Sequence, residues 1–116
     1  MDVESFREFC LNKPGVSEGF PFDSKTLVFK VMGKMFALTN IDLFESVNLK
    51  CDPEYAVELR ETFQGVKPGF HMNKTHWNTV SSVSDVPDKL IQDLIDLSYD
   101  LVVKSLTKRL RDELQG

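Results

Sequence analysis

LVFKVMGKMFALT, residues Leu27–Thr39, is the stretch of sequence that decides the fold. It consists of two apolar, β-prone runs, Leu27–Met32 and Met35–Thr39, on either side of Gly33-Lys34. A two-residue connection that begins with glycine is typical of a type II′ turn. The stretch therefore predicts a β-hairpin with Gly33 and Lys34 in the turn.

Side-chain alternation assigns the two faces of this hairpin. In the register set by the turn, Val31 faces Phe36 on the side expected to form the core, and Phe29 faces Leu38 on the same side. The opposite side carries a mixed set of side chains: Lys30, Met32, Met35 and Ala37. This second face is less polar than a solvated sheet face usually is, so we expect a loop or a partner to cover part of it.

Further elements are predicted on both sides of the hairpin. A helix over Asp2–Asn12, capped by Asp2, precedes it. Ser17–Phe22 predicts an edge strand, because Pro21 cannot donate to a ladder of hydrogen bonds. After the hairpin come a turn at 41–44, a strand at 46–50, a helix from Pro53 to about Phe63 capped by Asp52, a loop at 67–69, a strand at 74–80, and a long helix from Pro87 to Leu106 or Leu114.

The order of these elements predicts an α+β fold. Strands follow one another rather than alternating with helices, which argues against a parallel, doubly wound sheet. We expect a two-layer domain in which helices pack on one face of an antiparallel sheet. At 116 residues the chain can bury one hydrophobic core, so residues 1–116 are predicted to form a single domain.

Composition limits the class of protein. Hydrophobic residues make up 41% of the chain and charged residues 28%, as in ordinary globular proteins. No apolar run approaches the roughly 20 residues of a membrane-spanning helix, and the acidic N-terminus lacks the basic start of a signal peptide. Cys10 and Cys51 are isolated from each other, which indicates reduced thiols. We therefore expect a cytoplasmic monomer with no membrane contact.

Sequence motifs for catalysis or for a cofactor are absent. The chain has no glycine-rich phosphate loop and no G-x-S-x-G. His71 and His76 could contribute to a metal site, but zinc needs two further ligands and there is no C-x-x-C pair, so polar surface histidines are favoured. Buried thiols are favoured over a Cys–His nucleophile for Cys10 and Cys51. We expect no catalytic residue, no metal, no cofactor and no enzymatic activity.

Positive charge gathers in the segment Val66–Val80. This segment holds both histidines and the only tryptophan, and no carboxylate lies between Phe63 and Ser84, although the net charge of the chain is −4. Basic groups beside an aromatic ring suit a nucleic acid. The leading hypothesis is weak, salt-dependent binding of DNA by a basic hairpin and loop surface. The residues assigned to this surface are Lys30, Lys34, Lys50, Lys67, Lys74, His76, Trp77 and Asn78.

Strand alternation qualifies this hypothesis. In an extended segment Lys74, His76 and Asn78 share one face, and Trp77 points to the other. The tryptophan could therefore be part of the core rather than a stacking platform. The alternative function is a protein- or small-ligand-binding module with no nucleic-acid role, which would use the face of Met32 and Met35 and a groove beside Trp77.

The chain also resembles the MmcQ/YjbR family of small bacterial proteins. The stretches that carry the resemblance are Phe20–Phe22, Val28–Leu38, Asn48–Glu54, Pro68–Val80 and Ile95–Val103. The resemblance implies a fold like that of CyaY and frataxin, with helices on one face of an antiparallel sheet, and it implies DNA binding. Iron binding is not carried over from frataxin, because the first helix offers only a sparse set of acids: Asp2, Glu4 and Glu8.

Overall fold

The computed structural model describes the whole chain, residues 1–116. Its centre is a six-stranded antiparallel sheet in the order β1-β2-β3-β4-β6-β5. The strands are β1 (Val16–Gly19), β2 (Thr26–Val31), β3 (Lys34–Asn40), β4 (Ser46–Lys50), β5 (Val66–Pro68) and β6 (Trp77–Ser81). The helices are α1 (Val3–Leu11), α2 (Pro53–Thr62), α3 (Asp88–Ser105) and α4 (Lys108–Gln115).

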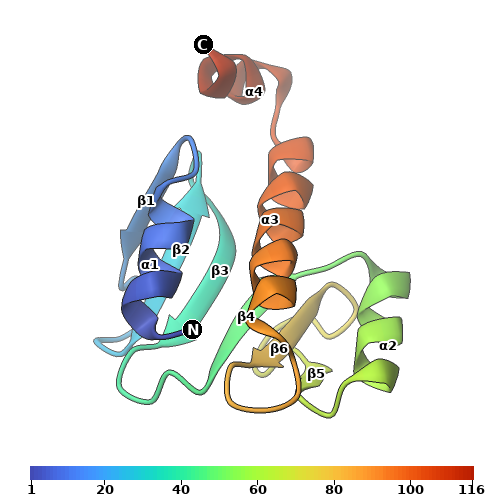
Figure 1. Cartoon of the computed structure of the whole chain (residues 1–116). Coiled ribbons are helices and arrows are strands. Elements are labelled where there is room, and N and C mark those ends of the chain that lie inside the picture. Colours follow the sequence, from blue (N-terminus) through green and yellow to red (C-terminus); the bar gives the residue numbers. More distant parts are fainter.

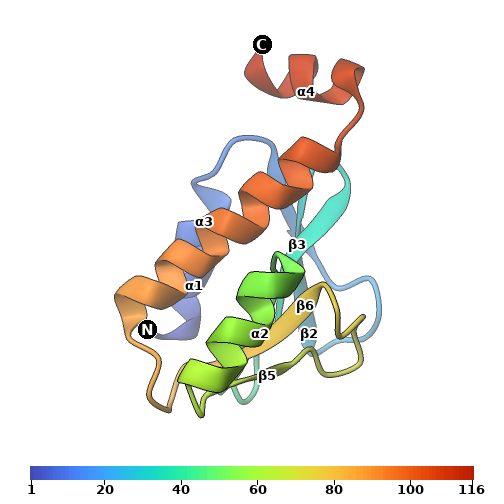
Figure 2. The same ribbon diagram turned by 90° about the vertical axis from the view of Figure 1, so that its right-hand side faces the viewer.

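Helices cover one face of this sheet. Figure 1 looks onto that face, with α1 and α3 in front of the strands and α2 beside β5 and β6. In Figure 2 the loops that join β1 to β2 and β5 to β6 extend on the side away from α1 and α3. The predicted two-layer α+β fold with an antiparallel sheet is therefore confirmed. No helix combines the length and the apolar character that crossing a membrane requires.

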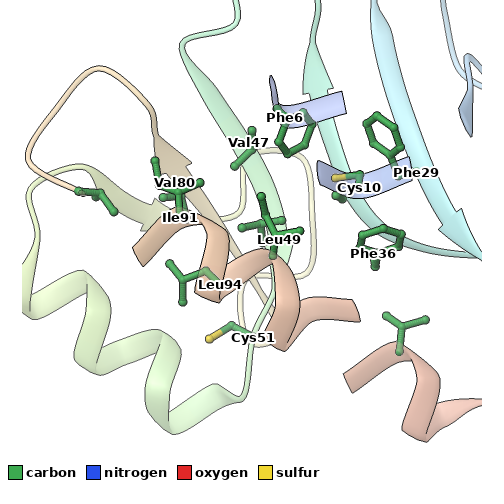
Figure 3. Close-up of a cluster of buried hydrophobic side chains, with 14 of the residues drawn as sticks. Phe6, Cys10, Phe29, Phe36, Val47, Leu49, Cys51, Val80, Ile91 and Leu94 are labelled. Atoms are coloured by element: carbon green, nitrogen blue, oxygen red, sulfur yellow. The ribbon is translucent and has the colours of Figure 1, made fainter. Parts of the chain in front are cut away.

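The main core lies between the helices and the sheet. Figure 3 shows Phe6 and Cys10 of α1 close to Phe29 of β2 and Phe36 of β3, while Ile91 of α3 lies over β4 and β6. The rings of Phe6 and Phe29 meet edge to face with centroids 5.4 Å apart. Such aromatic pairs contribute about 1 kcal/mol beyond the burial of their surface.

The hairpin turn differs from the predicted one by one residue. Val31 pairs with Lys34, so the turn residues are Met32 and Gly33. Both have positive φ, 48° for Met32 and 87° for Gly33, which defines a type I′ turn. This turn matches the right-handed twist of the strands, and its second position takes the glycine. Met32 packs against the main core, so the predicted common face of Met32 and Met35 does not exist.

A β-bulge changes the register beyond this turn. Lys30 pairs with Met35 and Phe29 pairs with Ala37, which leaves Phe36 without a partner in β2. The extra residue places Phe36 and Ala37 together in the main core. Leu38 consequently points to the opposite face, so its predicted pairing with Phe29 on the core side is wrong.

The segment after α2 also departs from the sequence-based expectation. Val66–Pro68 is an edge strand rather than a loop, and β6 begins at Trp77 rather than at Lys74. Asn73 explains the late start, because its Oδ1 accepts from the backbone N–H of Thr75 at 2.9 Å and holds a turn. Lys74 and His76 therefore lie before the strand, and the prediction that they occupy the strand face opposite to Trp77 does not apply.

Helix caps agree well with the sequence. Asp2 and Asp52 accept hydrogen bonds from Ser5 N at 2.8 Å and Tyr55 N at 3.3 Å, as predicted. The long C-terminal helix, however, is divided. Leu106 has an extended backbone, and Thr107 caps a separate helix α4 by accepting from Leu110 N at 3.3 Å.

Candidate functional site

The sheet face opposite the helices has no helix over it, and we call it the open face. Its strand residues are Ser17, Gly19, Thr26, Val28, Lys30, Met35, Leu38, Asn40, Ser46, Asn48, Lys50, Lys67, Trp77, Thr79 and Ser81. The charged members are all lysines. The only carboxylate in any strand is Glu18, and it bonds to Arg7 of α1 at 2.7 Å. These bonds hold the pKa of Glu18 below its usual range.

An apolar cluster lies at the centre of the open face. Trp77 is only 9% exposed and packs with Val28 and Leu38, and Met35 and Met72 lie against them. Gly69 approaches this cluster closely, because a Cβ at that position would lie 2.8 Å from Trp77 Cβ. Lys50 pairs directly with Trp77 across the ladder, so the tryptophan and this lysine share a face. The indole supports the surface, and little of it is available for stacking.

A pocket of about 470 Å³ opens beside this cluster. Its walls are the two loops that protrude from the open face, one through Phe22 and Asp23 and the other through Phe70 and His71. Phe22 is 64% exposed and Phe70 is 67% exposed. The floor is formed by strand side chains, mainly polar: Thr26, Leu38, Asn40, Ser46, Asn48 and Thr79. Volumes of roughly 300–1,000 Å³ are typical of ligand sites.

Hydrogen bonds fix the Phe70 wall to the pocket floor. The backbone N–H of Phe70 donates to Thr79 Oγ1 at 2.9 Å, and Thr79 Oγ1 donates to Asn48 Oδ1. Asn48 Nδ2 has no partner in the protein. His71 adjoins Phe70 with ring centroids 4.0 Å apart, and its φ of 60° is uncommon for a residue with a side chain. The wall is thus held in a defined position with an amide group free at its base.

Loop hydrogen bonds fix the Phe22 wall as well. Asp23 Oδ1 accepts from the backbone N–H groups of Lys25 at 2.8 Å and of Thr26 at 2.7 Å, and Oδ2 accepts from Thr26 Oγ1 at 3.2 Å. These backbone donors hold the pKa of Asp23 below its usual range. Asp23 is therefore ionised at neutral pH, with both oxygens engaged.

A family model described as YjbR matches residues 11–101, a range that includes all six strands and the whole pocket. The chain belongs to the YjbR family. Two Escherichia coli relatives are similar over nearly their full length. YbdF of strain O157:H7, an uncharacterized protein, is 37% identical to this chain over an alignment that covers 94% of this chain and 93% of YbdF. YjbR of strain K12 is 34% identical over 96% of this chain and 95% of that protein.

Solved structures agree with this YjbR assignment. The crystal structure of Deinococcus radiodurans protein DR2400, a DUF419 domain, superposes with a TM-score of 0.92 at 43% identity, covering 98% of this chain and 88% of that one. The crystal structure of a Pseudomonas syringae protein has a TM-score of 0.74 at 28% identity, covering 87% and 98%. The fold described above is therefore shared with experimentally determined relatives.

This YjbR domain brings together some of the residues assigned from sequence and separates others. Lys30, Lys50 and Lys67 share the open face. Lys34 Nζ instead donates to Ser105 O at the end of α3, at 3.2 Å, and Lys74 Nζ donates to Gly69 O at 2.9 Å within its own loop.

Two other assigned residues lie apart from the open face. His76 is exposed in the turn before β6. Asn78 is 1% exposed on the helix side, where its Oδ1 accepts from Arg60 Nε at 2.7 Å and its Nδ2 donates to Ala56 O at 3.3 Å. Asn78 therefore joins β6 to α2 and is closed to a ligand.

The phenylalanines of the two pocket walls, Phe22 and Phe70, were not singled out from the YjbR sequence. A usable signal exists, because both stand in loops next to backbone-breaking residues, in Phe20-Pro21-Phe22 and in Pro68-Gly69-Phe70. A large apolar side chain in such a loop has no element to pack against, and it commonly marks a contact surface.

Both cysteines of this YjbR domain are buried, and their pKa values should appear in the pH dependence of stability. Burial raises the pKa of Cys10 to about 12 and that of Cys51 to about 11, from a reference of 9.0. Above pH 9 the unfolded state releases thiol protons that the folded state retains, so stability falls as the pH rises. By pH 10 we expect a loss of about 1 kcal/mol per thiol in urea unfolding.

A cysteine variant separates this effect from other titrations. Cys51→Ala should lose about half of the additional pH dependence between pH 8 and pH 10. Native protein at pH 8 should also react with Ellman's reagent only as fast as it unfolds. Rapid labelling of the folded protein would contradict the assigned burial.

Proposed function

We propose that this YjbR domain is a non-enzymatic, cytoplasmic binding module that engages DNA across its open face. One observation carries the proposal. In a chain of net charge −4, every charged strand side chain on this face is a lysine: Lys30, Lys50 and Lys67. A local field of this kind attracts a polyanion although the whole protein is acidic.

The spacing of the three lysines supports a polymer rather than a single small anion. Lys30 and Lys50 lie two strands apart, and so do Lys50 and Lys67 in the order β2-β3-β4-β6-β5. Neighbouring strands are about 4.8 Å apart, so successive lysines are separated by about 10 Å across the sheet. At these separations the long, flexible lysine side chains can reach different phosphates of one strand that crosses the sheet, and one phosphate cannot contact all three lysines.

Charge removal on the open face tests the proposal. Replacing Lys50 and Lys67 together by glutamine should weaken binding of a fluorescently labelled oligonucleotide by about tenfold or more at 50 mM salt. The slope of log K against log salt should also become shallower by about 1.4, because each lost phosphate contact removes about 0.7 for a single strand. Fluorescence anisotropy over a range of salt concentrations measures both quantities.

A matched variant controls for net charge. Lys104→Gln with Lys108→Gln removes the same charge from the end of α3 and the start of α4. This control should change affinity less than twofold and leave the slope intact. Equal losses in the two double variants would show that binding follows total charge rather than the open face. No binding by the native protein at low salt would exclude the proposal.

A further inference from the structure

We infer that the pocket between Phe22 and Phe70 receives one unpaired nucleobase, so that the strand bound on the open face is single-stranded. This inference rests on the proposed nucleic-acid function and adds to it a ligand group and a preferred strandedness. It follows from the chemistry of the pocket, from the position of the lysines around it, and from the depth at which its polar groups lie.

The chemistry of the pocket fits a neutral planar ring. Two largely exposed phenyl side chains, Phe22 and Phe70, form opposite walls, and aromatic side chains are the surfaces on which bases stack. No lysine or arginine lines the pocket, and its carboxylate, Asp23, already accepts from three donors of its own loop. A phosphate would meet this carboxylate and no permanent positive charge, so the pocket suits an uncharged group.

The polar groups on the floor suit the edge of a base. Asn40 Oδ1 accepts from the backbone N–H groups of Asp42 at 2.9 Å and Leu43 at 3.2 Å, which leaves Asn40 Nδ2 without a protein partner. Asn48 Nδ2 is free in the same way, and Ser46 Oγ has no partner either. Amide and hydroxyl groups of this kind can bond to the ring nitrogens and carbonyl oxygens of a base.

The lysines stand outside the pocket, where phosphates would lie. Lys67 pairs across the ladder with Thr79 of the pocket floor, and Lys50 follows Asn48 by two residues on the same face of β4. Two residues along a strand correspond to about 7 Å. A base that points into the pocket would therefore leave its flanking phosphates within reach of long lysine side chains.

This arrangement favours a single strand over a duplex. In a duplex the bases are stacked and paired, and the floor groups lie at the bottom of a pocket between two protruding loops. Bases of a single strand are free to turn outward and stack on aromatic side chains. Extrusion from a duplex would add an unpairing cost of a few kcal/mol.

The experiment compares three probes of equal length, about 16 nucleotides, so that the duplex stays paired under the conditions of the assay. They are a deoxythymidine strand, the same strand with abasic sites throughout, and a duplex. At constant salt the thymidine strand should bind at least tenfold more tightly than either of the others. The Phe22→Ala/Phe70→Ala double variant should weaken thymidine-strand binding by about tenfold to 100-fold, because stacking on an aromatic ring contributes about 1–3 kcal/mol per base.

Two internal comparisons make the result specific to the pocket. The double phenylalanine variant should bind the abasic strand as the native protein does, and its salt slope should be unchanged because no phosphate contact is lost. Val57→Ala/Leu97→Ala removes exposed apolar side chains from α2 and α3 instead, and it should bind all three probes normally. Since Phe22 and Phe70 are largely exposed, their variants should unfold at the native urea concentration.

The outcomes separate this inference from the proposed function. Loss of binding in the Lys50→Gln/Lys67→Gln variant but not in the phenylalanine variant would overturn the pocket assignment and keep DNA binding. Equal affinity for thymidine and abasic strands, or tighter binding of the duplex, would overturn it as well. No binding of any probe would exclude the proposed function itself.

Discussion

The free energy of unfolding should fall by about 3 kcal/mol when Trp77 is replaced by alanine. Trp77 is 9% exposed although no helix lies over it, because Val28 and Leu38, which face each other on β2 and β3, pack with it and Met72 packs against the cluster. Truncation of a buried aromatic side chain usually costs about 3–5 kcal/mol, and the lower end applies because this cluster is small and open to solvent on one side. Urea unfolding followed by far-ultraviolet circular dichroism measures the loss.

A conservative variant distinguishes a lost ring from a lost indole. Trp77→Phe keeps an aromatic group packed against Val28 and Leu38 and should cost less than about 1.5 kcal/mol. A change below 1 kcal/mol in the alanine variant would mean that Trp77 does not hold the open face together. The loop after Gly69 should become more accessible to protease in the alanine variant, because Met72 then loses the surface that it covers.

Ser98→Ala should cost about 3 kcal/mol, a large effect for the loss of one hydroxyl group. Ser98 is fully buried in α3, and its Oγ donates to Phe36 O at 2.5 Å and accepts from Lys50 N at 2.9 Å. Both backbone groups lie just beyond the paired part of β3 and β4, which begins at Ala37 and Leu49. Alanine would leave both of them buried without a partner, at about 1–3 kcal/mol each.

A matched control is available at the C-terminal end of the same helix. Ser105→Ala removes a hydroxyl that donates only to Val102 O of the same helix, at 2.6 Å, and it should change stability by less than about 0.5 kcal/mol. Equal effects at the two positions would show that the Ser98 bridge does not contribute specifically. Ser98→Cys would not restore stability, because a thiol is a weak donor and a weak acceptor.

Local signals in the sequence were sufficient for the architecture. The apolar runs around Gly33 identified the central hairpin, and Asp2 and Asp52 marked the two helix starts. The order of elements then gave the two-layer arrangement and the antiparallel sheet. These features depend on neighbours in the chain, which a sequence displays directly.

Features that depend on tertiary partners could not be predicted in this way. The bulge involves two adjacent apolar residues, Phe36 and Ala37. Strand alternation alone could assign either of them to the core. The extra residue is stabilised from a distance by Ser98, whose hydroxyl bonds to Phe36 O. A sequence does not show that a helix more than sixty residues later supplies this contact.

The candidate site shows the same limit. Lys30, Lys50 and Lys67 share the open face because β2, β4 and β5 turn the same side outward, whereas the bonds of Lys34 to Ser105 and of Lys74 to Gly69 depend on the fold. Asn78 is a polar residue in the basic segment, as a binding residue could be. Its side-chain oxygen, however, accepts a hydrogen bond from Arg60 and is not available to a ligand. Residue type alone therefore identified candidates, and the direction of each side chain decided among them.

The outermost strands restrict how any partner could approach this sheet. β5 has three residues and ends in Pro68, which has no N–H to donate, and β1 has four residues that include Glu18 and Gly19. Edge strands that are short, charged or contain proline discourage a second chain from extending the sheet by main-chain hydrogen bonding. We therefore expect concentrated solutions to resist fibrillar growth. Recognition is left to the side chains of a broad surface, where substitutions can change ligand preference without rebuilding the backbone.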